Sequence, residues 1–210
     1  MIIPPMIPIR SIRIALVAAV VLSGTLTASA QTKGRIGVGG SVTLNNTTDS
    51  DVGTAWSFGP LVRINPRPGW RFASAFNWYN ADLDNPAGGD APFARFNIRP
   101  VMGGIGYTLG PPKTLVNFSV VLGPSFNRAY FRDAFPDAAG SSIEAKTSFA
   151  VRPGISVTQT LATRVGFTAF AGYMINRPQV TYRSNTGQQV QDRWRADSIV
   201  LSVGMVYSVF

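Results

Sequence analysis

The chain of 210 residues contains no cysteine and no histidine, and its 19 basic and 10 acidic side chains give a formal net charge of +9. These absences exclude disulfide scaffolds, thiolate zinc sites, a cysteine lipid anchor and every catalytic scheme that uses imidazole. Only 14% of the residues are charged and 45% are hydrophobic, whereas a soluble domain usually carries about 25% charged residues, so the composition favours a chain that is not surrounded entirely by water.

The first thirty residues, 1–30, have the pattern of a secretory signal peptide. Two arginines precede an apolar run over 14–22 and a small-residue cleavage site, Ala28-Ser29-Ala30. Polar residues interrupt the apolar stretch before it reaches the about 20 residues that a transmembrane helix requires. We expect cleavage to leave residues 31–210 as one domain with 17 basic and 10 acidic groups, a net charge of +7.

The mature domain alternates between apolar and small or polar residues with a period of two, which is typical of β-strands. Glycine and proline recur too often for long helices. Alternation and turn residues together predict eight strands, at 35–44, 56–64, 70–79, 95–109, 116–127, 146–157, 165–175 and 198–207.

The two faces of these strands differ in size. One face is bulky and apolar, and the opposite face is mostly Gly, Ala, Ser and Asn with a few arginines. A soluble barrel would carry charge on the outward face, whereas small residues suit the interior of a narrow barrel whose bulky face contacts lipid. In the segment 95–109 this rule assigns Phe96, Ile98, Pro100 and Met102 to the lipid face.

The connections between the strands alternate in length. Short turns are expected at 65–69, 110–113 and 162–164, and long loops at 45–53, 80–93, 128–145 and 177–196. This pattern predicts an all-β, up-and-down antiparallel transmembrane barrel. With an even strand count, both mature termini lie at the short-turn end.

Four prolines, Pro60, Pro100, Pro124 and Pro153, lie within predicted strands. Each one removes a hydrogen-bond donor from the ladder, and a closed barrel has no edge that tolerates this loss. We therefore expect β-bulges at these positions.

The last strand carries the most specific signal. Val203–Phe210 resembles the aromatic-ended assembly signal of small eight-stranded outer-membrane barrels of the OmpA and OmpX type, within the porin family of β-barrels. Tyr207 lies three positions before Phe210, whereas the family usually spaces these aromatics two apart. The resemblance implies a location in the cell outer membrane with both termini periplasmic, contact with outer-membrane lipid, insertion by the barrel assembly machinery, and a monomer.

Alternation also points four basic residues inward, Arg95, Arg99, Lys146 and Arg152, with Glu144 as the nearest acid on that face. They have two interpretations. The arginines form a hydrogen-bonded plug without an open pore, or they line a narrow lumen that favours anions. The basic residues are scattered through apolar strands, which is not the clustered pattern of a nucleic-acid-binding surface.

These observations predict a non-enzymatic barrel with a structural or surface-interaction role and weak porin activity through a basic lumen. No catalytic or metal-ligating constellation and no cofactor are predicted. The alternative is a soluble periplasmic or secreted β-barrel that binds a small hydrophobic ligand in its interior. The discriminating observation is whether five aromatic side chains face out of the barrel or into it, namely Phe72, Phe96, Phe118, Phe149 and Phe167.

Overall fold

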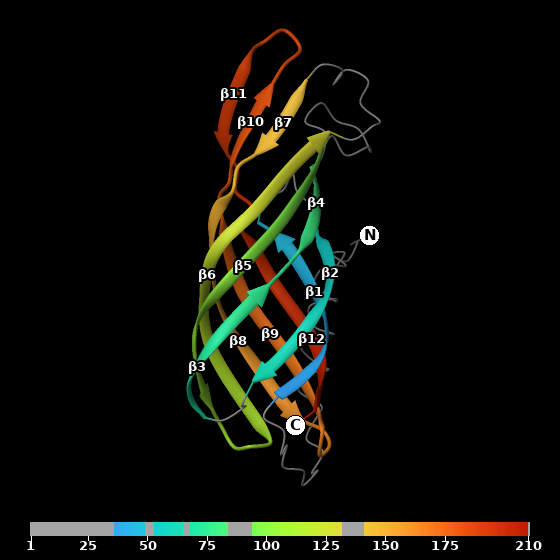
Figure 1. Cartoon of the computed structure of the whole chain (residues 1–210), viewed down its shortest axis with the longest axis vertical. Coiled ribbons are helices and arrows are strands. Elements are labelled where there is room, and N and C mark those ends of the chain that lie inside the picture. Colours follow the sequence, from blue (N-terminus) through green and yellow to red (C-terminus); the bar gives the residue numbers. More distant parts are fainter. Residues whose placement is uncertain (1–35, 49–52, 65–67, 84–93, 132–140, 210) are drawn as a thin grey trace, which may run out of the picture.

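The computed structural model describes residues 36–48, 53–64, 68–83, 94–131 and 141–209 (Figure 1). The expected signal peptide lies outside the described residues. Within the described residues, no helix is long and apolar enough to cross a membrane.

The wall is one antiparallel sheet of long strands wrapped around the vertical axis of the molecule (Figure 1). Neighbouring strands follow the order β2-β1-β12-β9-β8-β6-β5-β3, and β4 continues the line of β3 along β5. The described residues therefore supply eight strand positions, and the predicted all-β, up-and-down architecture is confirmed. The wall strands are β1 (Ile36–Thr47), β2 (Ala55–Ile64), β3 (Gly69–Phe76), β4 (Tyr79–Leu83), β5 (Ala94–Leu109), β6 (Thr114–Phe131), β8 (Ser148–Thr160), β9 (Val165–Asn176) and β12 (Ser198–Ser208).

A second, three-stranded sheet rises from the long-loop end of the wall (Figure 1). Two of the segments expected to be loops supply its strands, β7 (Ser142–Ala145), β10 (Gln179–Arg183) and β11 (Gln189–Arg193). Gly187, with φ of 84°, lies in the turn between β10 and β11, because glycine adopts this left-handed conformation without strain. We call this sheet the extension.

The four strand prolines do not create bulges, so that expectation is wrong. A bulge would shift the register, yet β5 and β6 pair with the same offset on both sides of Pro100 and Pro124. Pro124 pairs with Phe149 of β8 but has no ladder partner on β5, and Pro153 pairs with Val120 but has none on β9. Each proline is thus accommodated without a bulge, because it is paired with a neighbouring strand on one side only.

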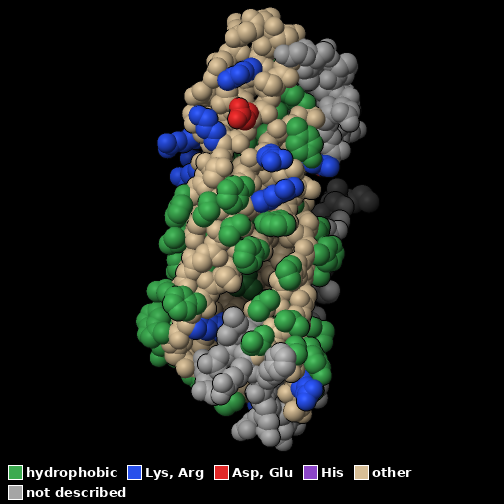
Figure 2. All heavy atoms as spheres, in the orientation of Figure 1, with side chains coloured by type: hydrophobic (Ala, Val, Ile, Leu, Met, Phe, Trp, Pro, Cys, Tyr) green, Lys and Arg blue, Asp and Glu red, His purple; other side chains and the backbone are tan. Residues whose placement is uncertain are grey.

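The wall has a seam between β2 and β3. Among the described residues, neither β3 nor β4 forms a ladder with β2, and Pro60 pairs only with Gly40 of β1. Figure 2 shows the surface hollowed in this region. The upper part of the seam is bridged by side chains, because Ser57 Oγ donates to Asn77 Oδ1 at 3.3 Å and Asn77 Nδ2 donates to Asn45 Oδ1.

Replacing Asn77 by leucine is expected to destabilise the barrel by about 1 to 3 kcal/mol, because buried Asn45 and Ser57 would each lose a hydrogen-bonding partner. Urea unfolding of the protein in detergent micelles measures this change. Asn80→Leu is the matched control, since Asn80 is exposed on the next strand segment. Equal unfolding midpoints for the two variants would show that the bridge across the seam does not stabilise the barrel.

Candidate functional site

The outer face of the barrel is a continuous band of exposed apolar side chains. Phe72 is 94% exposed and Phe58 81% exposed, values that a water-facing surface would rarely carry together. Aromatic residues mark both ends of the band. Trp70 packs edge-on against Tyr107 near the short turns, with ring centroids 5.2 Å apart, and Trp56, Trp78, Phe126 and Phe149 lie towards the long loops. This is the pattern of a lipid-facing wall with interfacial aromatic girdles.

The height of this band is set by β6. Its outward residues are all apolar from Val116 to Phe126. Above them, the outward residues are Arg128 and Tyr130. The run from Val116 to Phe126 is roughly 33 Å long, which gives about 25 Å of height at a tilt of roughly 40°. That height matches the hydrocarbon layer that a barrel must cross.

The lumen near the short turns is narrow and polar. Arg71 points inward, and its Nε donates to Asn117 Oδ1 at 3.1 Å, which also accepts from Thr108 Oγ1. Higher in the lumen, Thr43 donates to Ser202 across the neighbouring strands at 3.0 Å. Small and polar residues therefore satisfy one another here, as the face contrast predicts.

The lumen near the long loops is filled by apolar side chains. Phe96, Ile98 and Met174 are fully buried, and Met102 is 2% exposed. Trp194 covers this cluster, with its ring centroid 4.3 Å from that of Phe96. Beside the cluster, Asn176 donates from Nδ2 to Ser125 Oγ and accepts from Ser148 Oγ. These side chains form an apolar plug in the upper lumen.

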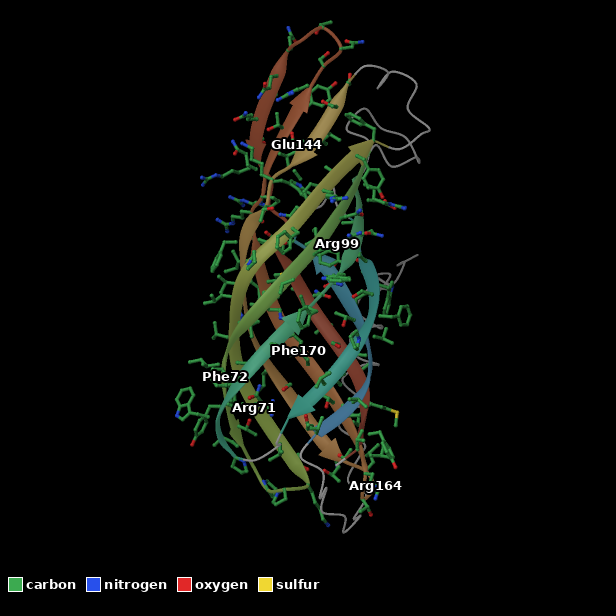
Figure 3. All side chains as sticks on the ribbon, viewed as in Figure 1. Arg71, Phe72, Arg99, Glu144, Arg164 and Phe170 are labelled. Atoms are coloured by element: carbon green, nitrogen blue, oxygen red, sulfur yellow. The ribbon has the colours of Figure 1, made fainter. Side chains whose placement is uncertain are left out.

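Arg152 is inside the barrel, as predicted, and stacks on an aromatic ring. Its guanidinium carbon lies 4.7 Å from the centroid of Phe170. Gly154 and Gly172 make room for that ring, since a Cβ at either position would lie 2.5 to 2.6 Å from its atoms. Figure 3 shows Phe170 at mid-height in the barrel. The arrangement is a packed cation–π contact in the lumen rather than one element of a charged ring.

The other predicted lumen bases lie elsewhere. Arg99 is exposed, and Arg95 is on the same outward face of β5, while Phe96 and Ile98 point inward. Lys146 is exposed at the base of the extension, and Glu144 lies on β7 in the extension. The assignment of Arg95, Arg99 and Lys146 to the lumen is therefore wrong, as is the assignment of Phe96, Ile98, Pro100 and Met102 to the lipid face.

For Phe96 and Ile98 the physical reason is that this end of β5 rises above the membrane-facing band, whereas Pro100 lies level with Ser125, and Met102 below it, within the height of the band and on the same inward face. Above the band the outward face of a strand meets water and the inward face meets the protein core, so apolar residues turn inward and arginines outward. The lower half of β5 shows which alternate residues of the strand face outward. Ile105, Tyr107 and Leu109 are outward, and an unbroken period of two places Phe96 inside.

Two ion pairs hold the upper rim. Arg95 donates from Nε to Asp82 Oδ1 at 2.8 Å across β4 and β5, and this carboxylate raises the pKa of Arg95 above its ordinary value. Arg177 donates to the nearly buried Asp197 at 3.1 Å, and Asp197 also accepts from the backbone N–H of Asn176. The first pair joins the neighbouring strands β4 and β5, and the second joins the residue after β9 to the residue before β12.

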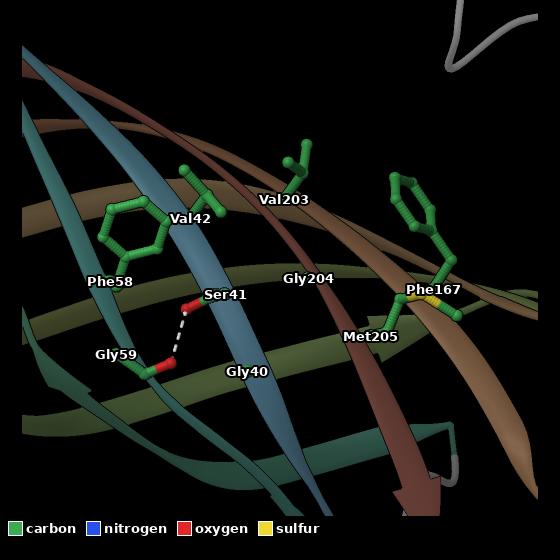
Figure 4. Close-up of a pocket in the computed structure, with 9 residues that line it drawn as sticks. All are labelled: Gly40, Ser41, Val42, Phe58, Gly59, Phe167, Val203, Gly204 and Met205. Atoms are coloured by element: carbon green, nitrogen blue, oxygen red, sulfur yellow. Dashed lines mark hydrogen bonds between the residues drawn. The ribbon is translucent and has the colours of Figure 1, made fainter.

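The outer surface of β2, β1, β12 and β9 carries a shallow groove of about 500 Å³ (Figure 4). It opens above Gly40, which has no side chain to fill the space between Phe58, Phe167 and Met205. Ser41 Oγ donates to the carbonyl of Gly59 at 3.4 Å beneath it. The groove is part of the apolar band.

The predicted C-terminal signal is described in part. Tyr207 faces outward at the short-turn end and is 50% exposed, with its hydroxyl 3.5 Å from Nη1 of Arg164. Phe210 lies outside the described residues. Over the part of the chain that the structure describes, no group of three or more potential metal ligands occurs.

Neither a protein-family model nor a curated protein matches the sequence. Solved structures do match the fold. The outer membrane protein OprG from Pseudomonas aeruginosa aligns with a TM-score of 0.67 at 14% identity, covering 85% of this chain and 97% of that one. Neisserial surface protein A gives 0.51 at 18% identity, covering 83% and 97%. A major outer membrane protein from Thermus thermophilus gives 0.50 at 11% identity, covering 82% and 98%. The chain therefore has the fold of small outer-membrane β-barrels.

Proposed function

We propose that the protein is an integral outer-membrane β-barrel without enzymatic activity, with a structural or surface-interaction role. The observation that carries this proposal is the apolar band, which is tall enough for a hydrocarbon layer and bounded by aromatic side chains at both ends. The fold shared with outer-membrane barrels supports it. The extension and the long loops then face the outside of the cell, and both mature termini lie in the periplasm.

The orientation of the aromatic residues favours this proposal over a soluble ligand-binding barrel. Phe72, Phe118 and Phe149 are exposed on the outer face, and Phe167 borders the outer groove. Phe96 alone of the five faces inward, in the part of β5 that lies above the band. A soluble barrel would bury such residues around its ligand, whereas here they cover the outside.

Cell fractionation tests the location. The protein is expected in the outer-membrane fraction, to require detergent for extraction, and to migrate differently on gels before and after heating, because small barrels resist detergent until heated. A protein that stays in the periplasm or medium without detergent contradicts the proposal. We expect its insertion to depend on the barrel assembly machinery and its purified form to be a monomer.

The lumen is proposed to be closed to ions. Phe96, Ile98, Met102 and Trp194 fill its upper part, and Arg152 is stacked on Phe170 below them. Planar-bilayer recordings of the purified protein are expected to give no stepwise conductance. Discrete, anion-selective conductance steps would contradict the closed lumen and support the alternative of an open lumen lined by basic residues.

A further inference from the structure

The outward bases gather in the upper part of the molecule. Figure 2 shows Lys and Arg side chains clustered over the upper part of the molecule, above the hydrophobic band. Two of them, Arg99 on β5 and Arg128 on β6, are exposed on adjacent strands. Figure 3 places Arg99 above Phe170 and Phe72 along the barrel axis.

The register brings Arg99 and Arg128 together. Arg99 pairs with Phe126, and Asn97 pairs with Arg128, so the two arginines are diagonal neighbours on one face of the sheet. Diagonal neighbours in an antiparallel pair lie about 7 to 8 Å apart, within reach of one small group between long side chains.

These two arginines differ from Arg95 and Arg177 of the rim. Arg95 and Arg177 each have a carboxylate at ion-pair distance, but no carboxylate among the described residues lies at that distance from Arg99 or Arg128. Between them, the Oδ1 atom of Asn97 is buried and accepts no hydrogen bond within the described part of the chain. Within the described residues, two guanidinium groups without an ion-pair partner and one unsatisfied acceptor thus share one patch.

The apolar band ends directly below this patch. The next outward position below Arg99 on β5 is Val101, and the next one below Arg128 on β6 is Phe126. In a barrel that spans the outer membrane, the patch therefore lies at the level where the acyl chains of the outer leaflet end and their headgroups begin. A lipid whose chains lie along Val101 and Phe126 would present its headgroup to the two arginines.

We propose that Arg99, Arg128 and Asn97 form a binding site for the headgroup of a phosphorylated glycolipid in the outer leaflet. Guanidinium groups bind phosphate oxygens through charge-assisted hydrogen bonds. The carbonyl oxygen of Asn97 accepts a hydrogen bond from a sugar hydroxyl or amide of the headgroup. The apolar wall beneath supplies the contact for the acyl chains, which selects a lipid over free phosphate. This inference rests on the outer-membrane location proposed above.

Native mass spectrometry of the detergent-solubilised protein tests the site, with diphosphoryl lipid A as the probe. The variant R99Q/R128Q is expected to bind it roughly 25-fold more weakly, since each arginine near an anionic lipid surface contributes about a factor of five. The matched control is R183Q/R193Q, which removes two exposed arginines from the extension and the same amount of charge. The control is expected to bind within about twofold of the unmodified protein.

Three outcomes would overturn the proposal: equal affinity of R99Q/R128Q and the unmodified protein, an equal loss in R183Q/R193Q, or displacement of the lipid by millimolar inorganic phosphate. Phosphatidylcholine of matched chain length is the lipid control, and equal binding of it would also overturn a phosphate-specific site. Heat-modifiable gel mobility of each variant reports folding and insertion separately. If R99Q/R128Q has normal heat-modifiable mobility and unchanged lipid A binding, the lipid site alone is refuted. If the unmodified protein is absent from the membrane fraction, the proposed function is refuted.

Discussion

Replacing Gly104 by alanine is expected to destabilise the barrel by about 2 to 3 kcal/mol, whereas the same change at Gly103 is expected to leave stability nearly unchanged. A Cβ on Gly104 would lie 2.0 Å from the carbonyl oxygen of Val120, a backbone atom of β6 that cannot swing aside. A Cβ on Gly103 meets nothing within 4 Å. The two glycines are adjacent on β5 and point to opposite faces, so each variant controls for the other.

Urea unfolding in detergent micelles, followed by tryptophan fluorescence, compares the two variants. Both substitutions change the unfolded chain in the same way, and both lower its backbone freedom. A difference between them therefore reports the close approach of β5 and β6. If Gly104→Ala unfolded at the same urea concentration as Gly103→Ala, the tight packing of this part of the wall would be refuted.

The second large effect is expected from charge placed at mid-height on the outer face. Leu122→Arg is expected to destabilise the membrane-inserted barrel by about 2 to 4 kcal/mol, because an arginine at the bilayer midplane loses its hydration. Val116→Arg, on the same face of the same strand near its short-turn end, is expected to cost at most about 1 kcal/mol, since there the side chain reaches the interface.

Unfolding from lipid vesicles measures this depth dependence. Leu122 is 47% exposed in the absence of lipid, so a water-facing wall would accept arginine there without penalty. Equal stabilities of Leu122→Arg and Val116→Arg would mean that the outer face does not lie in a hydrocarbon layer.

Much of the fold follows from the alternation of residue size. On β6 the bulky residues Phe118, Val120 and Leu122 are outward and Asn117 and Val121 inward, as expected. The same rule holds for β1, β2, β3, β8, β9 and β12 because these strands cross the layer over most of their length. In these strands the difference in residue size predicts which face is outward, because lipid contact favours bulky residues outside and the narrow lumen favours small residues inside.

The rule fails where the environment outside the barrel changes along one strand. In the upper half of β5 the outward neighbours of Arg95 and Arg99 are water or headgroups, so the buried face becomes the apolar one. The local difference in residue size between the two faces therefore assigned Phe96 and Ile98 to the wrong face. Counting in steps of two from the outward residue Ile105 places both of them inside. Arg95 and Arg99 were misplaced for this reason, and Lys146 was misplaced because it lies at the base of the extension rather than within a wall strand.

Other features depend on contacts between distant segments. The side-chain bridge from Asn45 through Asn77 to Ser57 and the stacking of Arg152 on Phe170 follow from register and curvature, which single-strand patterns do not determine. The extension could have been suspected from the alternation of Val180 and Tyr182 and from Gly187, since a glycine in a polar segment favours a turn.

The central claim is that the bulky face of the wall contacts lipid, and single-cysteine spin labelling tests it most directly. The chain has no cysteine, so labels at Val120, Val121 and Leu122 need no background removal. In lipid vesicles, collision with oxygen is expected to exceed collision with a water-soluble nickel complex at positions 120 and 122, and both are expected to be low at position 121. Greater access of the nickel complex at positions 120 and 122, or of oxygen at position 121, would contradict the account.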